Sequence, residues 1–309
     1  MGTTLHMVTG FLESGKTTYI NGMLKTPEYN EKNVLVIVCE EGTCDLDAKT
    51  SDNMHTVYID KEEELTAPLL ASWEGKYHPD MAIIEFNGMW KMEDFYKTCV
   101  KADWDLVKIT VLAEAGTFIP YCRNMGTLMS EKLNNADVLI FNRCTDKLKE
   151  SLRLRGLQYL NDAIKIFFEN EDGQLEPYES EDFKILDLSQ DIVEITDAKY
   201  AFWYKDMLHD PKKYDGIRIK AKLLMRRTPR FPGEYLPGRI AMVCCENDMQ
   251  YFGFIARGEM LEQFKSFDWF EATGVIKAEE HKAYGGVGPV FYVEEAAKCY
   301  APDQEYVGF

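Results

Sequence analysis

The sequence has no long hydrophobic run. None of its apolar stretches approaches the roughly 20 residues that an α-helix needs to span a bilayer. A charged leader followed by an apolar core is also missing, because a strand-like run and a glycine-rich turn come first. We therefore expect a cytoplasmic protein without a membrane span.

The sequence also lacks the cysteine pattern of a small secreted domain. Its eight cysteines are scattered over 309 residues, so we expect most of them to be reduced thiols rather than a disulfide framework. They are Cys39, Cys44, Cys99, Cys122, Cys144, Cys244, Cys245 and Cys299.

Positive charge is scarce. The formal net charge is −17, and residues 215–309 carry only −2 of it, with 12 Lys and Arg against 14 Asp and Glu. The first 214 residues therefore carry −15, and such a surface repels a polyanion. This argues against extended nucleic acid as a partner, whereas a nucleotide bound with Mg²⁺ needs only local positive charge.

The first 190 residues alternate short β-rich runs with helical patterns, which is typical of a parallel sheet with crossover helices. We expect a doubly wound, mostly parallel α/β domain over residues 1–190. The expected strands are residues 5–9, 34–38, 81–84, 109–113, 138–141 and 185–188. Apolar residues at helical spacing are Tyr19, Ile20, Met23 and Leu24, and then Leu157, Leu160 and Ile164.

The pattern changes in the second half of the chain. Residues 169–182 are acidic and predict a solvated loop, and residues 191–214 predict a linker with an aromatic-rich helix at 198–208. Residues 215–309 predict five strands, at 217–225, 239–245, 251–256, 269–277 and 290–293, with a short helix at 259–264. This order suggests a small β-barrel of the oligonucleotide/oligosaccharide-binding (OB) type.

The segment from Gly10 to Thr17 carries the strongest motif. It reads G-F-L-E-S-G-K-T, which satisfies G-x-x-x-x-G-K-[ST] between a strand and an amphipathic helix. In such a loop the backbone N–H groups surround the β-phosphate and Lys16 reaches the β and γ oxygens. Thr17 offers its hydroxyl to Mg²⁺. The motif predicts nucleoside-triphosphate binding, but it does not by itself separate GTP from ATP.

This loop, with Thr18 after it, resembles the G-F-L-G-x-G-K-T-T loop of the CobW-like GTPases, relatives of proteins that load metals into hydrogenase and urease. Residues 36–47 are similar to the switch segment of that family, and residues 83–88 to its strand ending in E-x-x-G. The resemblance implies GTP hydrolysis with Mg²⁺, and a homodimer. It places nucleotide contacts at Gly10, Glu13, Ser14, Gly15, Lys16, Thr17, Thr18 and Gly88.

Three side chains are the expected catalytic groups. Lys16 neutralises charge on the transferred phosphoryl group, and Glu85, directly after an apolar run, holds a magnesium water or orders the attacking one. Glu40, on the loop after the second strand, is a candidate sensor of the γ-phosphate. The alternative for Glu40 is an ordinary solvated carboxylate in an acidic domain.

The base-recognition segment departs from the family pattern V-x-x-x-N-K-x-D. Asn142 and Arg143 match its N and K, but Thr145 stands at the aspartate position and Asp146 comes one residue late. A carboxylate there pairs with the guanine edge and discriminates against adenine. Either the loop bulges to bring Asp146 to the base, or the protein is a permissive NTPase or an ATPase.

The C-x-C-C motif through which the family is linked to metal delivery is missing. Cys39 and Cys44 lie on the switch loop with His55 downstream, and two thiolates with an imidazole suit Zn²⁺, or Co²⁺ in a cobalt-handling relative. The alternative is two reduced cysteines without a metal. Cys244 and Cys245 are a second candidate pair, although neighbours on a continuous strand point to opposite faces.

The last hundred residues resemble the soluble C-terminal domain of a family of putative permease subunits, which shares a P-G-R-F-x-M-x-C-C stretch with residues 237–245. We therefore expect a GTPase that couples its nucleotide state to transition-metal handling or to insertion into a client metalloprotein. The alternatives are a nucleotide-gated module whose barrel docks RNA or a membrane permease, and a redox sensor built on the vicinal cysteines.

Overall fold

A computed structural model describes residues 2–40, 46, 53–159, 161, 163–170, 172–178, 185–242, 249–302 and 305–308. The chain forms two compact units. Unit 1 comprises Met1–Lys149 and Leu160–Tyr178, and unit 2 comprises Glu150–Tyr159 and Glu179–Phe309. No helix in the described part of the chain is long and apolar enough to cross a membrane.

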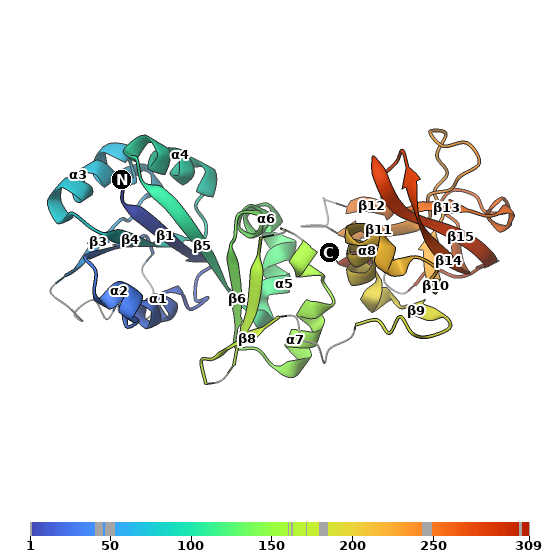
Figure 1. Cartoon of the computed structure of the whole chain (residues 1–309), viewed down its shortest axis with the longest axis horizontal. Helices are drawn as coiled ribbons and strands as arrows, with labels where there is room; N and C mark the ends of the chain where they lie inside the picture. The colour runs from blue at the N-terminus through green and yellow to red at the C-terminus, as the bar shows by residue number, and fades with distance from the viewer. Residues whose placement is uncertain are drawn as a thin grey trace. The chain divides into compact units, whose positions relative to one another are not determined.

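Unit 1 is built on an eight-stranded sheet of order β3-β2-β4-β1-β5-β6-β7-β8 (Figure 1). All neighbouring strands are parallel except the final pair, β7 and β8. The strands are β1 (Thr4–Gly10), β2 (Val34–Val38), β3 (Met54–Tyr58), β4 (Met81–Asn87), β5 (Asp105–Glu114), β6 (Val138–Asn142), β7 (Lys165–Glu169) and β8 (Leu175–Pro177).

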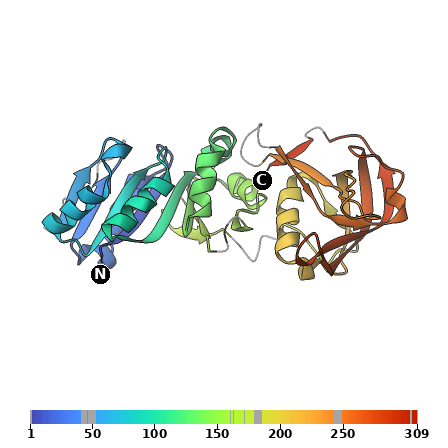
Figure 2. The same ribbon diagram turned by 90° about the horizontal axis from the view of Figure 1, so that it is seen from above.

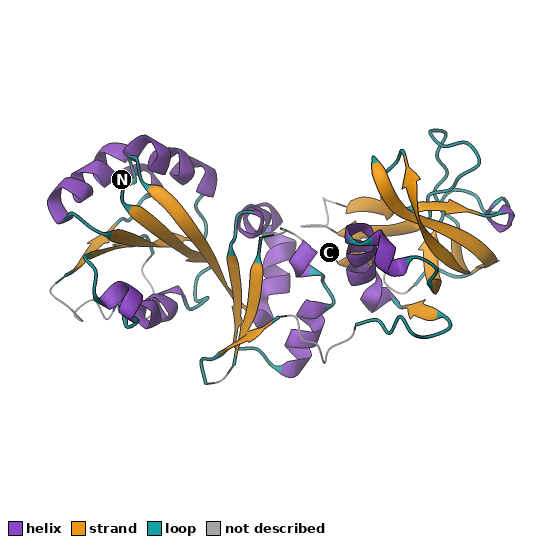
Figure 3. Ribbon diagram, viewed as in Figure 1, coloured by secondary structure: helices purple, strands orange, loops and turns teal. Residues whose placement is uncertain are grey.

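Helices cover both faces of this sheet, with α1 and α2 on one face and α3 and α4 on the other (Figure 3). In α1, Ile20, Met23 and Leu24 pack against the buried side chains of β2 and β4, so the expected helix after the phosphate loop is present. The helices of unit 1 are α1 (Lys16–Leu24), α2 (Pro27–Asn30), α3 (Ala67–Tyr77), α4 (Met92–Ala102), α5 (Ala115–Asn124), α6 (Gly126–Asn134) and α7 (Asp146–Arg153), which continues into unit 2. The expected mostly parallel α/β fold is confirmed.

Two expectations for the end of the predicted α/β domain, residues 1–190, were wrong. Residues 185–188 form no strand, because β7 pairs with β6 and occupies that position in the sheet. The helical spacing of Leu157 and Ile164 was misleading as well. Leu157–Tyr159 is only a 3-10 turn, and β7 follows with buried Ile166 and Phe168 on alternate residues. The expected loop at 169–182 contains the short strand β8.

Unit 2 is built on a second sheet, of order β12-β11-β10-β14-β15-β13, with β16 beside β11 and β9 beside β10. Its orange and red strands curve around a shared interior (Figure 2). The strands are β9 (Val193–Ile195), β10 (Arg218–Leu224), β11 (Gly238–Met242), β12 (Met249–Gly253), β13 (Ile255–Arg257), β14 (Trp269–His281), β15 (Gly286–Lys298) and β16 (Tyr306–Gly308). Where the sequence predicts a helix at 259–264, the described chain has a 3-10 turn, Glu259–Leu261.

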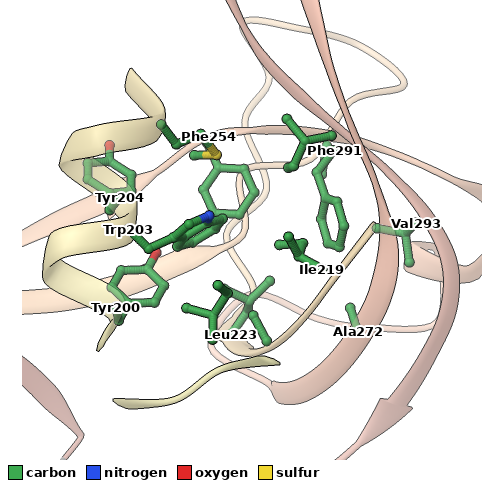
Figure 4. Packing of buried hydrophobic residues seen from close by; sticks show 14 of the residues in the cluster. Tyr200, Trp203, Tyr204, Ile219, Leu223, Phe254, Ala272, Phe291 and Val293 are labelled. Atoms are coloured by element: carbon green, nitrogen blue, oxygen red, sulfur yellow. The ribbon is translucent and has the colours of Figure 1, made fainter. Parts of the chain in front are cut away.

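The expected helix at 198–208 is α8 (Tyr200–His209), and it supplies much of the core of unit 2. Trp203 points from this helix toward Phe254, and Tyr200 and Tyr204 belong to the same buried cluster (Figure 4). Trp203 meets Phe254 edge to face at 5.4 Å between ring centroids, a favourable arrangement for aromatic rings. The region 191–214 therefore belongs to unit 2, where α8 forms part of the core, rather than being a linker between two domains.

Candidate nucleotide-binding site

The expected site residues of unit 1 lie at one edge of the sheet. Because β1, β2, β4, β5 and β6 are parallel, their carboxyl ends meet at this edge, where ligands of open α/β sheets bind. The phosphate loop follows β1, Glu40 follows β2, Gly88 follows β4, and Asn142 ends β6.

The phosphate loop passes from β1 into α1 through a left-handed residue. Gly15 precedes α1 with φ 87°, and Tyr19 N–H donates to its carbonyl at 3.0 Å to close the first helical turn. A Cβ on Gly15 would lie 2.7 Å from Nδ2 of Asn142. Glycine therefore suits this position both because of its left-handed φ and because a side chain would be too close to Asn142. No side chain caps the start of α1, which leaves its first N–H groups to a ligand.

Lys16 is buried beneath the loop that precedes it. Its Nζ donates to the carbonyls of Gly10 at 2.9 Å and Phe11 at 3.0 Å, and it forms an ion pair with Oε2 of Glu40 at 2.5 Å. The side chains of Lys16 and Glu40 are only 3% and 12% exposed, so this pair is little screened by water. Two of the expected catalytic residues are thus in direct contact.

Glu85 lies beside Thr17. The Thr17 hydroxyl donates to Oε1 of Glu85 at 2.8 Å, whereas Oε2 is buried and has no hydrogen-bond partner among the described residues. Burial raises the pKa of Glu85, and the hydroxyl of Thr17 and the ammonium of Lys16 oppose that increase. The carboxylate therefore has one buried oxygen that can accept from a ligand.

Gly88 brings the segment after β4 against the phosphate loop. A Cβ at this position would lie 2.3 Å from the carbonyl oxygen of Gly10 and 2.9 Å from Cα of Phe11, so only glycine allows this approach. Asn87 orients the same turn, because its Oδ1 accepts from Met89 N–H at 2.8 Å.

Asn142 and Arg143 lie at the end of β6. Asn142 is buried, and its Nδ2 donates to the carbonyl of Ser14 at 2.8 Å, while its Oδ1 has no partner among the described residues. Arg143 has a left-handed φ of 52° and lies 3.5 Å from Glu114, the last residue of β5. Asn142 therefore links the base-recognition segment to the phosphate loop and keeps a free acceptor.

Asp146 opens helix α7 instead of bulging into a loop. Lys149 N–H donates to the Thr145 carbonyl at 2.9 Å and Leu148 N–H reaches its hydroxyl at 3.4 Å, so Thr145 caps the helix. Asp146 is the first residue of α7 and is exposed. Of the remaining expected nucleotide contacts, Glu13 and Thr18 are exposed and Ser14 is buried.

The expected metal ligands are only partly within the described chain. Cys39 is 2% exposed at the end of β2, and its pKa is raised by burial and by the neighbouring carboxylates Glu85 and Glu40. His55 pairs with Leu35, four residues before Cys39, and stacks on Tyr77, so the structure does not bring it to the thiol. Cys44, Cys244 and Cys245 lie outside the described residues. No cluster of three or more His, Cys, Asp or Glu side chains suited to a metal occurs in the part of the chain that is described.

Two residues near this edge escaped the sequence interpretation. Glu114 faces Arg143, and buried Lys132 on α6 reaches the carbonyl of Trp90. A carboxylate ending an apolar run could have indicated Glu114. The spacing of Met129, Lys132 and Leu133 could have indicated a lysine on an apolar helix face.

Two protein-family models match the chain, one over each half. The CobW/HypB/UreG nucleotide-binding domain matches residues 4–166, and the DUF1980 C-terminal domain matches residues 173–308. No curated protein matches the chain.

Two solved structures can be compared with this chain. Hydrogenase maturation factor HypB from Archaeoglobus fulgidus is 15% identical and covers 54% of this chain and 80% of its own, with a TM-score of 0.38. Zn(II)-bound YjiA GTPase from E. coli is 17% identical and covers 89% of this chain and 95% of its own, with a TM-score of 0.41. The domain match spans more than half of the chain and contains the phosphate loop, Glu85 and Asn142. The chain therefore belongs to the CobW/HypB/UreG family and is a P-loop GTPase.

Proposed function

We propose that the chain hydrolyses GTP with Mg²⁺ at this edge of unit 1 and couples its nucleotide state to the handling of a transition metal. The observation that carries the catalytic part is the Thr17–Glu85 pair beside Lys16, with one buried carboxylate oxygen left unbonded. A buried carboxylate without full hydrogen bonding is costly unless a ligand completes it.

The donor set fits magnesium. Mg²⁺ prefers hydroxyl, carboxylate and phosphate oxygens, and the Thr17 hydroxyl and the Glu85 carboxylate lie 2.8 Å apart at the phosphate loop. When bound, the ion neutralises charge on the phosphate oxygens. The raised pKa of Glu85 is consistent with a carboxylate adapted to a cation at its buried oxygen.

The protein groups supply position and charge. Lys16 and the uncapped N-terminus of α1 bind the phosphates, and Gly88 holds the segment after β4 against the loop. The carboxylate of Glu40 binds the ammonium of Lys16, and the γ-phosphate would compete for the same ammonium because it is also an anion. We propose that the phosphate displaces Glu40 and thereby changes the switch loop that follows it.

For the base, we propose that Asn142 and Arg143 contact guanine. The free Oδ1 of Asn142 gives the edge of the base an acceptor. Because Asp146 is the exposed first residue of α7, guanine selectivity rests more on Asn142 than it does in proteins with the regular motif.

Unit 2 is proposed as the docking module for a client metalloprotein. Its strand order supports an OB-type barrel, because β12 and β13 are separated only by Phe254 and lie at opposite ends of the strand path. Stacking of RNA bases on these aromatic rings is not favoured, because arginine side chains already cover them. Arg226 lies over the ring of Tyr251, and Arg227 lies over the ring of Tyr235.

Phosphate release from GTP tests the hydrolase. The full-length chain should turn over GTP with Mg²⁺, lose activity when EDTA removes the ion, and lose it again as Glu85→Gln. Glu93→Gln, on an exposed side chain of α4, is the matched control and should behave as wild type. Equal rates for wild type and Glu85→Gln contradict the proposed site.

Zinc binding tests the metal-handling part. If Cys39 and Cys44 bind zinc on the switch loop, zinc affinity should change about five- to 150-fold between the GTP and GDP forms, the usual range of coupling between sites. Affinity should also rise with pH, because the raised pKa keeps the Cys39 thiol protonated and a ligating thiol must lose its proton.

Cys39→Ser with Cys44→Ser should remove both the zinc and the coupling, whereas Cys244→Ser with Cys245→Ser should leave the coupling intact. Zinc affinity that is the same in both nucleotide forms of the wild type rules out a switch-loop site.

A further inference from the structure

Lys132 is a lysine on the apolar face of a helix. It lies on α6 between the buried residues Met129 and Leu133, and it is 0% exposed. Its ammonium is therefore out of water, unlike most lysines, which extend a buried stem and keep the charge hydrated. An apolar side chain of similar length would suit this position better if packing were its only role.

The surroundings of Lys132 compensate only part of its charge. Its Nζ donates to the Trp90 carbonyl at 3.3 Å, but no carboxylate among the described residues comes within 4.0 Å of it. Burial lowers the pKa of Lys132, and the ammonium of Lys16 lowers it further, against the opposing effect of Glu131 and Glu62. A buried charge without a full set of partners is energetically costly, so the presence of Lys132 points to a ligand of opposite charge.

The Trp90 carbonyl belongs to the segment that carries Gly88. Residues 88–91 connect β4 to α4, and side chains from two other elements hold this connection and the first turn of α4. Glu62 accepts from Lys91 N–H at 3.2 Å, and Glu131, the neighbour of Lys132 on α6, accepts from Glu93 N–H at 3.1 Å. Lys132 thus binds this segment two residues beyond the glycine that touches the phosphate loop.

We infer that Lys132 is a positioning residue for GTP hydrolysis, one that fixes the Gly88 segment and adds a second positive charge at the γ-phosphate end of the site. This inference rests on the proposed function. Lys16 and Lys132 repel each other across the same buried region, and a polyanion relieves this repulsion in proportion to its charge. GTP carries one phosphate more than GDP, so Lys132 favours GTP.

The test compares Lys132→Met, which keeps the length and removes the charge, with Lys132→Arg, which keeps the charge. For Lys132→Met, the ratio of GTP to GDP affinity should fall about tenfold and kcat about ten- to 100-fold, less than the roughly 100- to 1,000-fold cost of removing a donor that contacts the reacting group itself. GDP affinity should fall less than GTP affinity, and the melting temperature should stay at or above its wild-type value. Lys132→Arg should recover most of the ratio, and Lys101→Met, an exposed lysine on α4, should change nothing.

The pH profile separates a charge effect from a packing effect. The lowered pKa means that Lys132 loses its charge at a lower pH than an ordinary lysine, so the GTP-to-GDP affinity ratio of the wild type should fall on the alkaline side. Lys132→Arg should keep its ratio to higher pH, because arginine stays charged. Lys16, Glu131 and Glu62 are the other charged groups around Lys132, and they are the same in both proteins.

An unchanged ratio and kcat in Lys132→Met would overturn the inference, and so would a parallel loss of GTP and GDP affinity with a lower melting temperature. If Lys132→Met does not fold, a wild-type ratio that is flat across alkaline pH overturns it. Failure of the wild type to hydrolyse GTP is a different result, and it rejects the proposed function itself.

Discussion

Units 1 and 2 both bury polar and charged side chains, and they differ in where atoms without a hydrogen-bond partner lie among the described residues. In unit 2 such atoms include Oε1 of Gln158 and Nε1 of Trp203, which are not part of its buried ion pairs, whereas in unit 1 several gather at one edge of the sheet. In unit 2, buried Asp206 accepts from Tyr159 at 2.5 Å, from Lys213 at 2.6 Å and from Tyr214. Arg239, 1% exposed, pairs with Asp197. In unit 1, polar atoms at the carboxyl edge of the sheet remain without partners among the described residues. They are Oγ1 of Thr9, Oγ of Ser14, Oε2 of Glu85 and Oδ1 of Asn142.

The difference separates structural polar groups from ligand-binding ones. A fully hydrogen-bonded buried network stabilises its own unit. Removing one member leaves the other buried groups without a hydrogen-bond partner, which costs stability. Incomplete groups clustered at one edge add nothing to stability until a ligand completes them. Substitutions should therefore cost stability in unit 2 and activity in unit 1.

The largest effect is expected from Lys16→Ala. Lys16 contacts the loop carbonyls and Glu40, and a phosphate would take the same ammonium. We expect GTP turnover to fall by about 10³-fold or more, the effect of removing a charged group that stabilises phosphoryl transfer. Phosphate-release kinetics measure the loss, and the melting temperature should show that unit 1 is still folded. Wild-type turnover in this variant would contradict the assignment of the site.

Asp206→Asn should produce the opposite result. The substitution keeps the size but weakens three hydrogen bonds to a buried carboxylate, so we expect a loss of about 2–4 kcal/mol in the free energy of unfolding. Scanning calorimetry can assign the loss, because GTP should stabilise only the transition of unit 1. A variant with unchanged stability would show that the buried network around Asp206 does not stabilise unit 2.

The third effect concerns the base. We expect the wild type to prefer GTP over ATP at least about tenfold, and Asn142→Ala to erase this preference, since a site built to bond guanine leaves polar groups unpaired with adenine. Asn142 also bonds the Ser14 carbonyl, so the variant will bind both nucleotides more weakly, and the ratio in a competition titration is the quantity to measure. Equal affinities in the wild type would make the protein a permissive NTPase.

The sequence was most informative where function depends on a local motif. The phosphate loop, Glu85 and Asn142 each lie beside a strong strand signal, and in the structure all three lie at or near the carboxyl ends of strands. Lys132 could not be found in this way, because its role depends on α6 packing against a segment about 40 residues earlier in the chain.

The motif alone did not decide whether Asp146 lies in a loop or a helix. Thr145 is a local signal for the helix, because threonine is a preferred N-cap residue. The misplaced strand at 185–188 has a different cause. The apolar residues from Leu157 to Phe168 fit both a helix and a strand, because the spacing around Leu157 is helical and the spacing in β7 alternates. Only the pairing of β7 with β6 shows that the last strand of this region is β7.

The smallest effect is the sharpest test of the comparison, because it uses the same kind of substitution as Asp206→Asn. Glu85→Gln should abolish turnover and yet stabilise unit 1 by about 1 kcal/mol at neutral pH without nucleotide or Mg²⁺, since it removes a buried charge with an unbonded oxygen.

The folded-state pKa of Glu85 is raised above 4.5, so the folded protein binds this proton more tightly than the unfolded chain. Stability from this group is therefore full below pH 4.5 and is lost as the pH rises through the folded-state pKa. The advantage of Glu85→Gln should grow from acidic to neutral pH and vanish as the pH falls toward 4.5, which urea unfolding at a series of pH values can measure. A Glu85→Gln protein that is less stable than the wild type at neutral pH would show that Glu85, like Asp206, is a structural carboxylate.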